Sequence, residues 1–348
     1  MEKIKTILYL GDANPKSNSY YRCKALERLG YKVLLINTSE FLNNKFSFLL
    51  NRIHYRTGYR FLQKSIYCKI KAVLEVGETF DLVWVNGGEY FGPKVLQLLQ
   101  KTNKKIVLYN NDDPTGRRDG NRFDSLLKSL PYYDLCVVMR EFNIKEYKQK
   151  GAKNLLRVFM SYDEMAHKPF EDVAMIKEQF KSDIAFIGTW MEQEKRDLFL
   201  MKLINAGLNV SIWGNRWEES KYWNIIKDNY KGKALGGKDY VAAIQGAKIC
   251  LGMLSKGNRD LHTRRSVEVP FIGGLFCAER TSEHLAMYQD GIEAFFWDNA
   301  DECITICNKL LADANLREQI KIAGRKRVLI NKVGNEDICK KIIATLNE

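Results

Sequence analysis

IKTILYLGDANPKSNSYYRCKALERLGYKVLLINT, residues 4–38, is the stretch that decides the fold. Two apolar, β-rich runs at 4–11 and 32–38 flank an amphipathic stretch, and Gly30 stands where a helix would end. The same order of strand, helix and strand continues through the first half, for example around 80–88 (FDLVWVNGG). Near-continuous apolar strands separated by helices predict a parallel sheet that is covered on both faces.

The alternation restarts after a polar passage around Pro169, so a second α/β unit is expected. We predict an N-terminal Rossmann-like domain at 1–165, a second at 180–328, and a C-terminal helix at 329–348 that is able to pack back on the first domain. Doubly wound sheets bind ligands at the carboxyl ends of their strands. Two such domains would therefore face a central cleft that holds the chemistry.

Composition agrees with two packed domains, because the chain has 348 residues and 45% of them are apolar. No charge-free apolar stretch reaches the roughly 18 residues of a membrane-spanning helix, and residues 1–16 lack the pattern of a signal peptide. We expect a cytoplasmic protein.

The eight cysteines are scattered, mostly through apolar segments, which indicates reduced core thiols. Although Cys303 and Cys307 lie one helical turn apart, we expect no metal site.

The net charge of +13 is compatible with nucleic acid, an anionic membrane or anionic small substrates, and charge alone does not decide among them. Residues 41–74 contain seven Lys or Arg and no acid, interleaved with apolar side chains. Two interpretations stay open for this segment. It is either a peripheral contact with acidic lipid headgroups on the inner face of the membrane or an ordinary solvated helix face.

Two common nucleotide motifs are absent. Gly11 is followed by DANP rather than by the G-x-G-x-x-G pattern, and there is no Walker A motif. Dehydrogenase and P-loop ATPase functions are correspondingly disfavoured.

The stretch TRRSVEVPFIGGLFCAERTSEHL, residues 263–285, carries the clearest chemistry. Arg264 and Arg265 stand where a helix would begin, and its free N–H groups together with these side chains can hold a diphosphate without a metal. One turn further on, Glu268 can accept hydrogen bonds from a ribose diol.

The limits of that helix follow from its flanking residues. Thr263 or Ser266 can cap it, and Pro270 is expected only near its first turn. Gly273 and Gly274 permit a tight turn into the next strand, and we count them among the donor-binding positions. An ordinary helix with surface charges is the alternative.

Residues 245–328 resemble the C-terminal signature of the CgeB-like (spore maturation protein) branch of the group 1 glycosyltransferases. The shared pattern has an Arg and a Glu before a Gly pair, then DG-x-E, and an R-x-x-I-x-x-x-G-R-x-R-V finish. The resemblance implies the GT-B fold and a nucleotide-diphosphate sugar donor used without a catalytic metal or other cofactor. It matches Glu268 to the carboxylate that binds the donor ribose and Arg264 or Arg265 to the basic position near the diphosphate. Val267 and Pro270 depart from the aromatic residue and alanine that are common in related sequences.

Other strand ends supply further candidate donor contacts. A small residue lets a backbone N–H approach a phosphate, a tryptophan can border the base unless it only anchors its loop, and the loop before the helix is basic. The predicted contacts are Gly188, Thr189, Trp213, Arg216, Lys256 and Asn258.

In the first domain, Glu89, Asp112 or Asp113 can polarise an acceptor hydroxyl as a general base. The alternatives for the two aspartates are a metal-binding DxD, which their spacing disfavours, and a turn before Pro114. The loop after the first strand is expected to line the acceptor or the donor sugar through Asp12, Ser17, Asn18 and Ser19.

These features together predict a metal-independent glycosyltransferase, with a glycan, a lipid-linked molecule or a protein as acceptor, in bacterial surface-glycan assembly. The alternatives are a nucleotide-sugar epimerase on the same fold, a non-catalytic partner that binds sugar nucleotides, and a basic nucleic-acid-binding protein. We do not expect nucleic acid to be the partner, because the arginine, glutamate and glycine pattern at 263–285 predicts saturable nucleotide binding instead.

Overall fold

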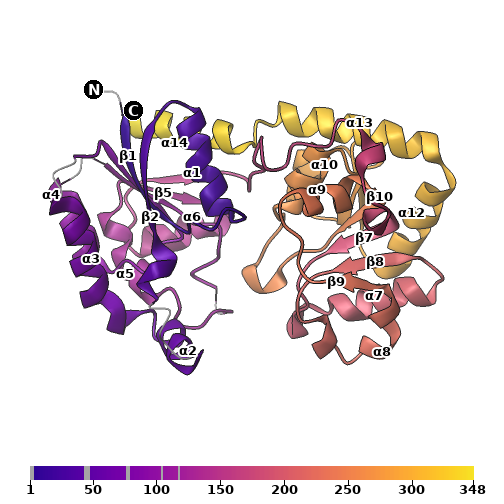
Figure 1. Cartoon of the computed structure of the whole chain (residues 1–348), viewed down its shortest axis with the longest axis horizontal. Coiled ribbons are helices and arrows are strands. Elements are labelled where there is room, and N and C mark those ends of the chain that lie inside the picture. The colour runs from indigo at the N-terminus through magenta and orange to yellow at the C-terminus, as the bar shows by residue number, and fades with distance from the viewer. Residues whose placement is uncertain (1–3, 43–47, 76–78, 103–104, 117) are drawn as a thin grey trace. The chain divides into compact units, whose positions relative to one another are not determined.

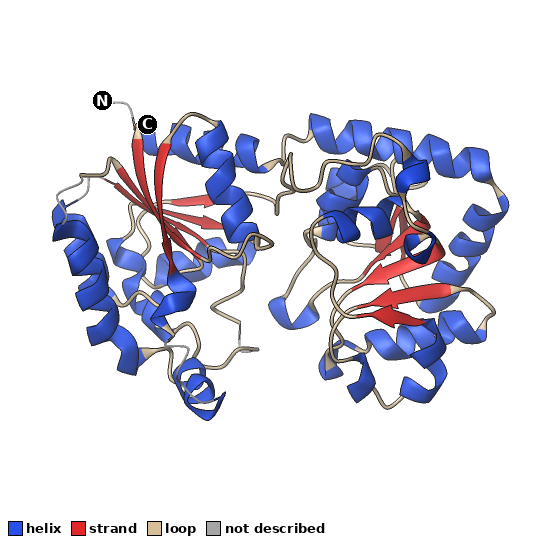
Figure 2. Cartoon of the chain, viewed as in Figure 1, coloured by secondary structure: helices blue, strands red, loops and turns tan. Residues whose placement is uncertain are grey.

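The chain consists of two compact α/β units, seen in a computed structural model that describes residues 4–42, 48–75, 79–102, 105–116 and 118–348. Unit 1 comprises Met1–Phe159 and Asn335–Glu348, and unit 2 comprises Met160–Gly334. Each unit has one six-stranded sheet between layers of helices (Figures 1 and 2). The predicted fold class, two parallel α/β sheets of Rossmann type, is confirmed. The chain passes from unit 1 to unit 2 after Phe159, a few residues before the expected end of the first domain at 165.

The sheet of unit 1 has the order β2-β1-β3-β4-β5-β6, and all of its strand pairs are parallel. Its strands are β1 (Thr6–Gly11), β2 (Lys32–Asn37), β3 (Leu82–Asn86), β4 (Lys105–Tyr109), β5 (Leu135–Val138) and β6 (Leu155–Arg157). The connections change direction between β1 and β3, the switch point at which open sheets of this kind bind ligands.

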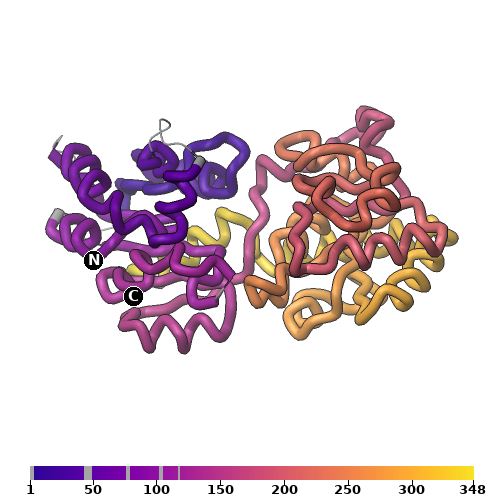
Figure 3. The backbone as a smooth tube through the Cα atoms, turned by 90° about the horizontal axis from the view of Figure 1, so that it is seen from below, coloured from indigo at the N-terminus to yellow at the C-terminus, as the bar shows by residue number. Residues whose placement is uncertain are grey.

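Helices cover both faces of this sheet. They are α1 (Asn18–Arg28), α2 (Phe48–Arg56), α3 (Gln63–Glu75), α4 (Pro93–Thr102), α5 (Asp124–Ser129), α6 (Glu141–Gln149) and α14 (Asn335–Asn347). Side chains of α3, α4 and α5 share one core with alternate residues of β1, β3 and β4. On the other face, the rings of Tyr9, Trp84 and Tyr109 stack in a row. The last helix of the chain, α14, packs against α1, and its backbone course can be followed in Figures 1 and 3.

The sheet of unit 2 has the order β12-β11-β10-β7-β8-β9 and is likewise parallel. Its strands are β7 (Ser182–Ile187), β8 (Val210–Trp213), β9 (Tyr230–Gly232), β10 (Ala247–Gly252), β11 (Phe276–Glu279) and β12 (Phe295–Trp297). Its helices are α7 (Arg196–Asn205), α8 (Trp223–Ile226), α9 (Lys238–Gln245), α10 (Arg265–Ile272), α11 (Ser282–Met287), α12 (Ala300–Ala312) and α13 (Ala314–Ile330). Here the switch point lies between β7 and β10.

None of the helices in the described ranges is apolar over a length that would let it span a bilayer. Within the basic segment 41–74, residues 43–47 lie outside the described residues, and Lys45 is among them.

Candidate functional site

The start of α10 is fixed by a buried chain of hydrogen bonds. The Thr263 N–H donates to Ser266 Oγ at 3.0 Å, Ser266 Oγ lies 2.8 Å from His284 Nε2, and His284 Nδ1 lies 2.6 Å from the Glu279 carbonyl oxygen. Since a carbonyl only accepts, His284 carries its proton on Nδ1, and Nε2 accepts from the Ser266 hydroxyl. Ser266 therefore secures the first turn from inside, and α10 begins at Arg265, where the sequence predicted.

Pro270 lies in the second turn of α10 rather than in the first, so the expected restriction to the first turn was wrong. A proline there removes the hydrogen bond to the carbonyl four residues earlier, that of Ser266. The hydroxyl of the buried Tyr288 donates to this carbonyl oxygen at 2.7 Å. The helix therefore accommodates the proline because a side chain replaces the missing N–H.

Glu268 lies in the first turn of α10 and is only 5% exposed. Tyr240 donates its hydroxyl proton to Glu268 Oε2 at 2.5 Å, and His167 Nε2 lies 3.7 Å from Oε1. Burial alone would raise the pKa of Glu268, but His167, Arg264, the Tyr240 hydroxyl and Arg265 lower it below the usual value. The side chain is therefore a carboxylate near neutral pH, held ready to accept hydrogen bonds.

A basic residue that the sequence analysis did not single out, Arg196, stands at the switch point of the sheet. Its Nη1 donates to the Thr189 carbonyl oxygen at 2.9 Å, after β7, and its Nη2 donates to that of Leu254 at 2.8 Å, after β10. Burial, and to a smaller degree the neighbouring Arg265, lower the pKa of Arg196. In the described part of the chain, the Nε atoms of Arg196 and Arg265 are buried without a hydrogen-bond partner. Arg265 lies near enough to Arg196 to lower its pKa, and a neighbouring pair of guanidinium groups is the kind of group that binds an anion such as a diphosphate.

A recess of about 210 Å³ lies beside Arg196 and is lined by residues of several strand ends and of the starts of α7 and α12. Lys256 belongs to its lining, with Nζ 3.5 Å from Glu279 Oε2, while its backbone N–H donates to Glu194 Oε2 at 2.9 Å. Asn258, in the same loop, keeps its side-chain oxygen buried without a hydrogen-bond partner among the described residues. Lys256 and Asn258 thus stay candidates for donor contact.

Three of the other predicted donor contacts are engaged elsewhere. The Gly188 N–H donates to the Trp213 carbonyl oxygen at 2.8 Å, and its own carbonyl accepts from Trp217 Nε1 at 2.8 Å, so neither group is open to a phosphate. Trp213 is 3% exposed inside the unit and cannot stack on a base. Arg216 forms two hydrogen bonds to the exposed Glu219.

The glycine pair lies at the far end of α10. Gly273 caps the helix with φ of 90°, and a Cβ on Gly274 would lie 2.8 Å from a methyl carbon of Ile244. Eight helical residues separate the pair from the arginines by about 12 Å. Its position assigns the pair to the turn and to packing, so the predicted contact with the donor is not supported.

In unit 1, a polar recess of about 360 Å³ opens at the carboxyl ends of β1 to β4, across the switch point between β1 and β3. Most of its lining residues are polar: Asp12, Thr38, Ser39, Asn86, Gly87, Glu89, Tyr90, Asn110, Asn111 and Asp112. Hydroxyl, amide and carboxylate groups at this density suit a ligand rich in hydroxyl groups. The structure thus brings together three of the predicted residues, Asp12, Glu89 and Asp112.

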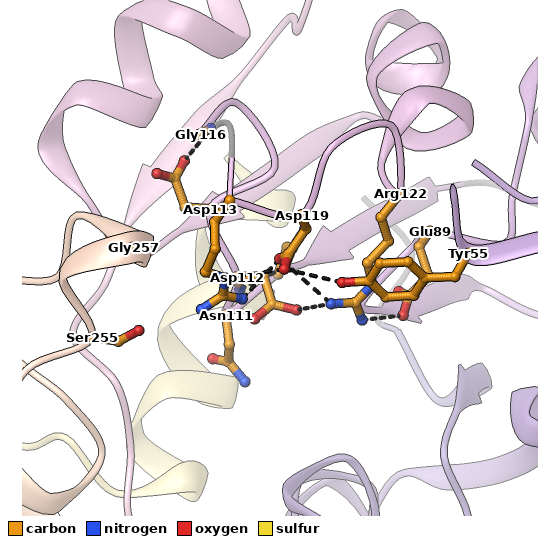
Figure 4. A network of polar contacts seen from close by, with 12 residues as sticks. Tyr55, Glu89, Asn111, Asp112, Asp113, Gly116, Asp119, Arg122, Ser255 and Gly257 are labelled. Atoms are coloured by element: carbon orange, nitrogen blue, oxygen red, sulfur yellow. Dashed lines mark hydrogen bonds and ion pairs between the residues drawn. The ribbon is translucent and has the colours of Figure 1, made fainter. Parts of the chain in front are cut away.

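Arg122, which the sequence analysis did not select, holds two of these carboxylates (Figure 4). Its Nη2 lies 2.8 Å from Glu89 Oε1, and its Nη1 lies 3.4 Å from Asp112 Oδ2 and 3.8 Å from Asp119 Oδ2. Tyr55 donates to the other oxygen of Asp119 at 3.0 Å. Burial alone would lower the pKa of Arg122, but Glu89 and Asp112 raise it, so the guanidinium stays charged. Glu89 and Asp112 are therefore fixed in place and partly neutralised.

Asp113 is not placed for catalysis. It is 3% exposed, and its Oδ1 accepts from the Asn143 side chain at 2.9 Å, from Thr115 Oγ1 at 3.0 Å and from the Gly116 N–H at 3.2 Å. These contacts close the turn after β4, as the alternative interpretation of this stretch as a turn predicted.

In the loop after β1, likewise, some predicted residues have structural roles and do not line the recess. Ser17 caps α1, accepting from the Tyr20 N–H at 3.1 Å and donating to the Asp12 carbonyl oxygen at 3.2 Å. Asn18 is the first residue of α1, and Ser19 is buried against β1. Of the four residues predicted here, Asp12 alone lines the recess among those described.

Seven of the eight cysteines are buried and Cys68 is exposed. Cys277, which the sequence analysis did not connect with Cys303 and Cys307, joins them so that the three sulfur atoms lie within 4.8 Å of one another. They are packed among apolar side chains of the unit 2 core.

Known proteins share the two-unit α/β fold of this chain and, over part of unit 2, its sequence pattern. A family model described as glycosyl transferase-like matches residues 195–343, while no curated protein matches the chain. Among solved structures, sucrose-phosphate synthase from Thermosynechococcus elongatus is similar with a TM-score of 0.73 and 11% identity, over 99% of this chain and 98% of that one. Anabaena HepE in complex with UDP and glucose is similar with a TM-score of 0.67 and 13% identity, over 99% of both chains. A glycosyltransferase from Rickettsia africae has a TM-score of 0.60 and 14% identity, over 99% of this chain and 98% of that one. The chain thus has the GT-B fold, and its residues 195–343 match a glycosyl transferase-like family model.

Proposed function

We propose that this protein transfers a sugar from a nucleotide-diphosphate donor, bound by unit 2, to a hydroxyl-rich acceptor bound by unit 1. The observation that carries the proposal is the start of α10, where a buried carboxylate, Glu268, lies one turn from Arg264 and Arg265. The family model covers this segment. UDP is the first nucleotide to test, because HepE was solved with UDP, with UDP and glucose, and with UDP-glucose.

On the donor side, departure of the nucleotide leaves additional negative charge on the diphosphate. The Nε–H groups of Arg265 and Arg196 have no hydrogen-bond partner among the described residues, and the positive end of the α10 dipole lies beside Arg265. These groups would stabilise the leaving group in the role that a metal ion has in other enzymes. We therefore propose a reaction that requires neither a metal nor another cofactor. Glu268 would accept hydrogen bonds from the ribose hydroxyl groups and so orient the nucleotide.

On the acceptor side, the ion pairs with Arg122 hold Glu89 and Asp112 in fixed positions as hydrogen-bond acceptors. They would therefore position an acceptor hydroxyl rather than remove its proton. Asp12 differs, because no cation lies within ion-pair distance of it in the described part of the chain, and one of its oxygens accepts from the Asn14 N–H at 3.0 Å. If the reaction needs a general base, we assign that role to Asp12.

The wider role that we propose is bacterial surface-glycan assembly, with a glycan, lipid-linked or protein acceptor and a location in the cytoplasm or on the inner face of the membrane. Its support is the resemblance of residues 245–328 to the CgeB-like branch and the polar lining of the unit 1 recess.

A panel of nucleotide diphosphates and their sugars tests the proposal. We expect UDP or another nucleotide diphosphate to raise the melting temperature saturably, in EDTA as well as in magnesium, and mass spectrometry to detect slow donor hydrolysis. Dependence on magnesium would refute metal independence. Equal and strongly salt-dependent binding of all polyanions would instead support the nucleic-acid alternative.

A further inference from the structure

One surface of unit 1 is both apolar and basic. We call it the α2 surface, and it is formed by α2, by the short 3-10 helix Arg60–Leu62 and by the first turn of α3. Its apolar members are Leu49, Leu50, Ile53 and Phe61, which are 65%, 42%, 41% and 61% exposed. Its basic members are Arg52, Arg56, Arg60 and Lys64, all exposed.

The members that belong to α2 share one side of this helix. Leu49, Ile53 and Arg56 follow one another at helical spacings of four and three residues, which places them on one face. The opposite side packs into the unit, where His54 is buried and Tyr55 donates to Asp119 at 3.0 Å. The helix is therefore held from behind and presents its apolar face to solvent.

The charge of this surface is uncompensated. In the described ranges, no carboxylate lies within ion-pair distance of any of its four basic side chains, and the guanidinium of Arg60 instead lies 4.6 Å from the centre of the Phe61 ring. Some exposed cations elsewhere in the chain do pair with a nearby acid, as Lys168 does with Glu171. An ordinary solvated helix face would carry acids as well as bases and would not expose four large apolar side chains together.

We propose that the α2 surface rests on an anionic lipid bilayer. Leu49, Ile53 and Phe61 would enter the boundary between headgroups and acyl chains, and the basic side chains would contact lipid phosphates. Nucleic acid fits less well, because leucine and isoleucine gain nothing from a phosphate backbone. The proposal does not depend on the sugar-transfer reaction. If the α2 surface binds a membrane, unit 1 and its polar recess are held at that membrane. A lipid-linked acceptor would be available there.

Co-sedimentation of the full chain with vesicles tests this proposal. We expect binding to vesicles that contain phosphatidylglycerol, weaker binding as salt rises, and no binding to pure phosphatidylcholine. R52Q together with R56Q should weaken partitioning by about 25-fold, at about fivefold for each charge. L49S together with I53S should weaken it by about tenfold or more at unchanged charge.

The matched control is K227Q together with K233Q, which removes the same charge from exposed positions of unit 2. Circular dichroism and nucleotide binding of every variant should equal those of the wild type, so that a failed sugar-transfer proposal and a failed membrane proposal remain distinguishable. Equal binding to neutral vesicles, or an equal loss in the control variant, would overturn the proposal. A polynucleotide that binds tightly and is insensitive to L49S and I53S would overturn it in favour of a nucleic-acid surface.

Discussion

Replacing Glu268 tests the donor site most directly. A hydrogen bond to a charged group contributes about 1.5 to 3 kcal/mol, so E268A should weaken UDP binding by about 10- to 150-fold if the carboxylate holds the ribose diol. Alanine also leaves the buried Tyr240 hydroxyl without its acceptor. E268Q keeps a carbonyl oxygen for that hydroxyl and removes only the charge, so it should cost about 1 kcal/mol, or about fivefold.

A cycle that changes both protein and ligand separates the diol contact from general damage to the site. Isothermal titration calorimetry would compare UDP with 2′,3′-dideoxy-UDP in the wild type and in E268A. If Glu268 binds the two hydroxyl groups, removing them weakens the wild type by about 10- to 150-fold but leaves E268A almost unchanged, because the interaction is already lost.

Additive losses in that cycle would refute the assignment and leave Glu268 with a purely structural role beside Tyr240 and His167. E293Q is the control, because it also breaks a carboxylate pair in unit 2, that of Glu293 with Arg327, outside the first turn of α10. It should leave the affinity for both nucleotides unchanged.

Three further predictions concern the supporting contacts. R122Q should lower acceptor turnover at unchanged nucleotide affinity, as measured by initial rates and calorimetry, because it frees two recess carboxylates. Burial is the main cause that lowers the pKa of His284 to about 4, so the folded state binds its proton less readily than the unfolded state does. Stability should therefore fall by about 3 kcal/mol as the pH drops from 6.5 to 4, and H284N should lose this component in urea titrations. Y288F should cost about 1 to 3 kcal/mol in thermal unfolding by stranding the Ser266 carbonyl, and P270A in the same chain should recover part of it by restoring an N–H.

The fold was readable from the sequence because its signals are local. Apolar runs such as TILYLG of β1 and LVWVN of β3 are buried along most of their length, and Gly30 ends the first helical segment with φ of 88°. What the sequence left open is which strands become neighbours, since pairing depends on contacts between distant segments. The two units accordingly have different strand orders, although their sequences alternate in the same way.

The candidate site was readable only in part, for the same physical reason. Glu268 and its arginines lie within one helical turn, so their proximity follows from spacing alone. Tyr240 and His167 reach Glu268 from 28 and 101 residues away, and nothing in the local sequence indicates it. Trp213 was predicted to contact the donor but is buried in the core of unit 2. The sequence cannot distinguish these two positions, because a tryptophan at a strand end is equally suited to lining a site and to filling a core.

Arg122 explains why the polar recess of unit 1 is stable with three carboxylates around it. Unpaired acids at the ends of adjacent strands would repel one another and raise each other's pKa. The guanidinium compensates Glu89 and Asp112 but not Asp12, so the recess has one fixed pair of acceptors and one carboxylate without a cationic partner among the described residues. A neutral, hydroxyl-rich acceptor can donate hydrogen bonds to all three. A phosphorylated ligand would be repelled by them, so an uncharged sugar is the group that fits this recess best if it binds the acceptor as we propose.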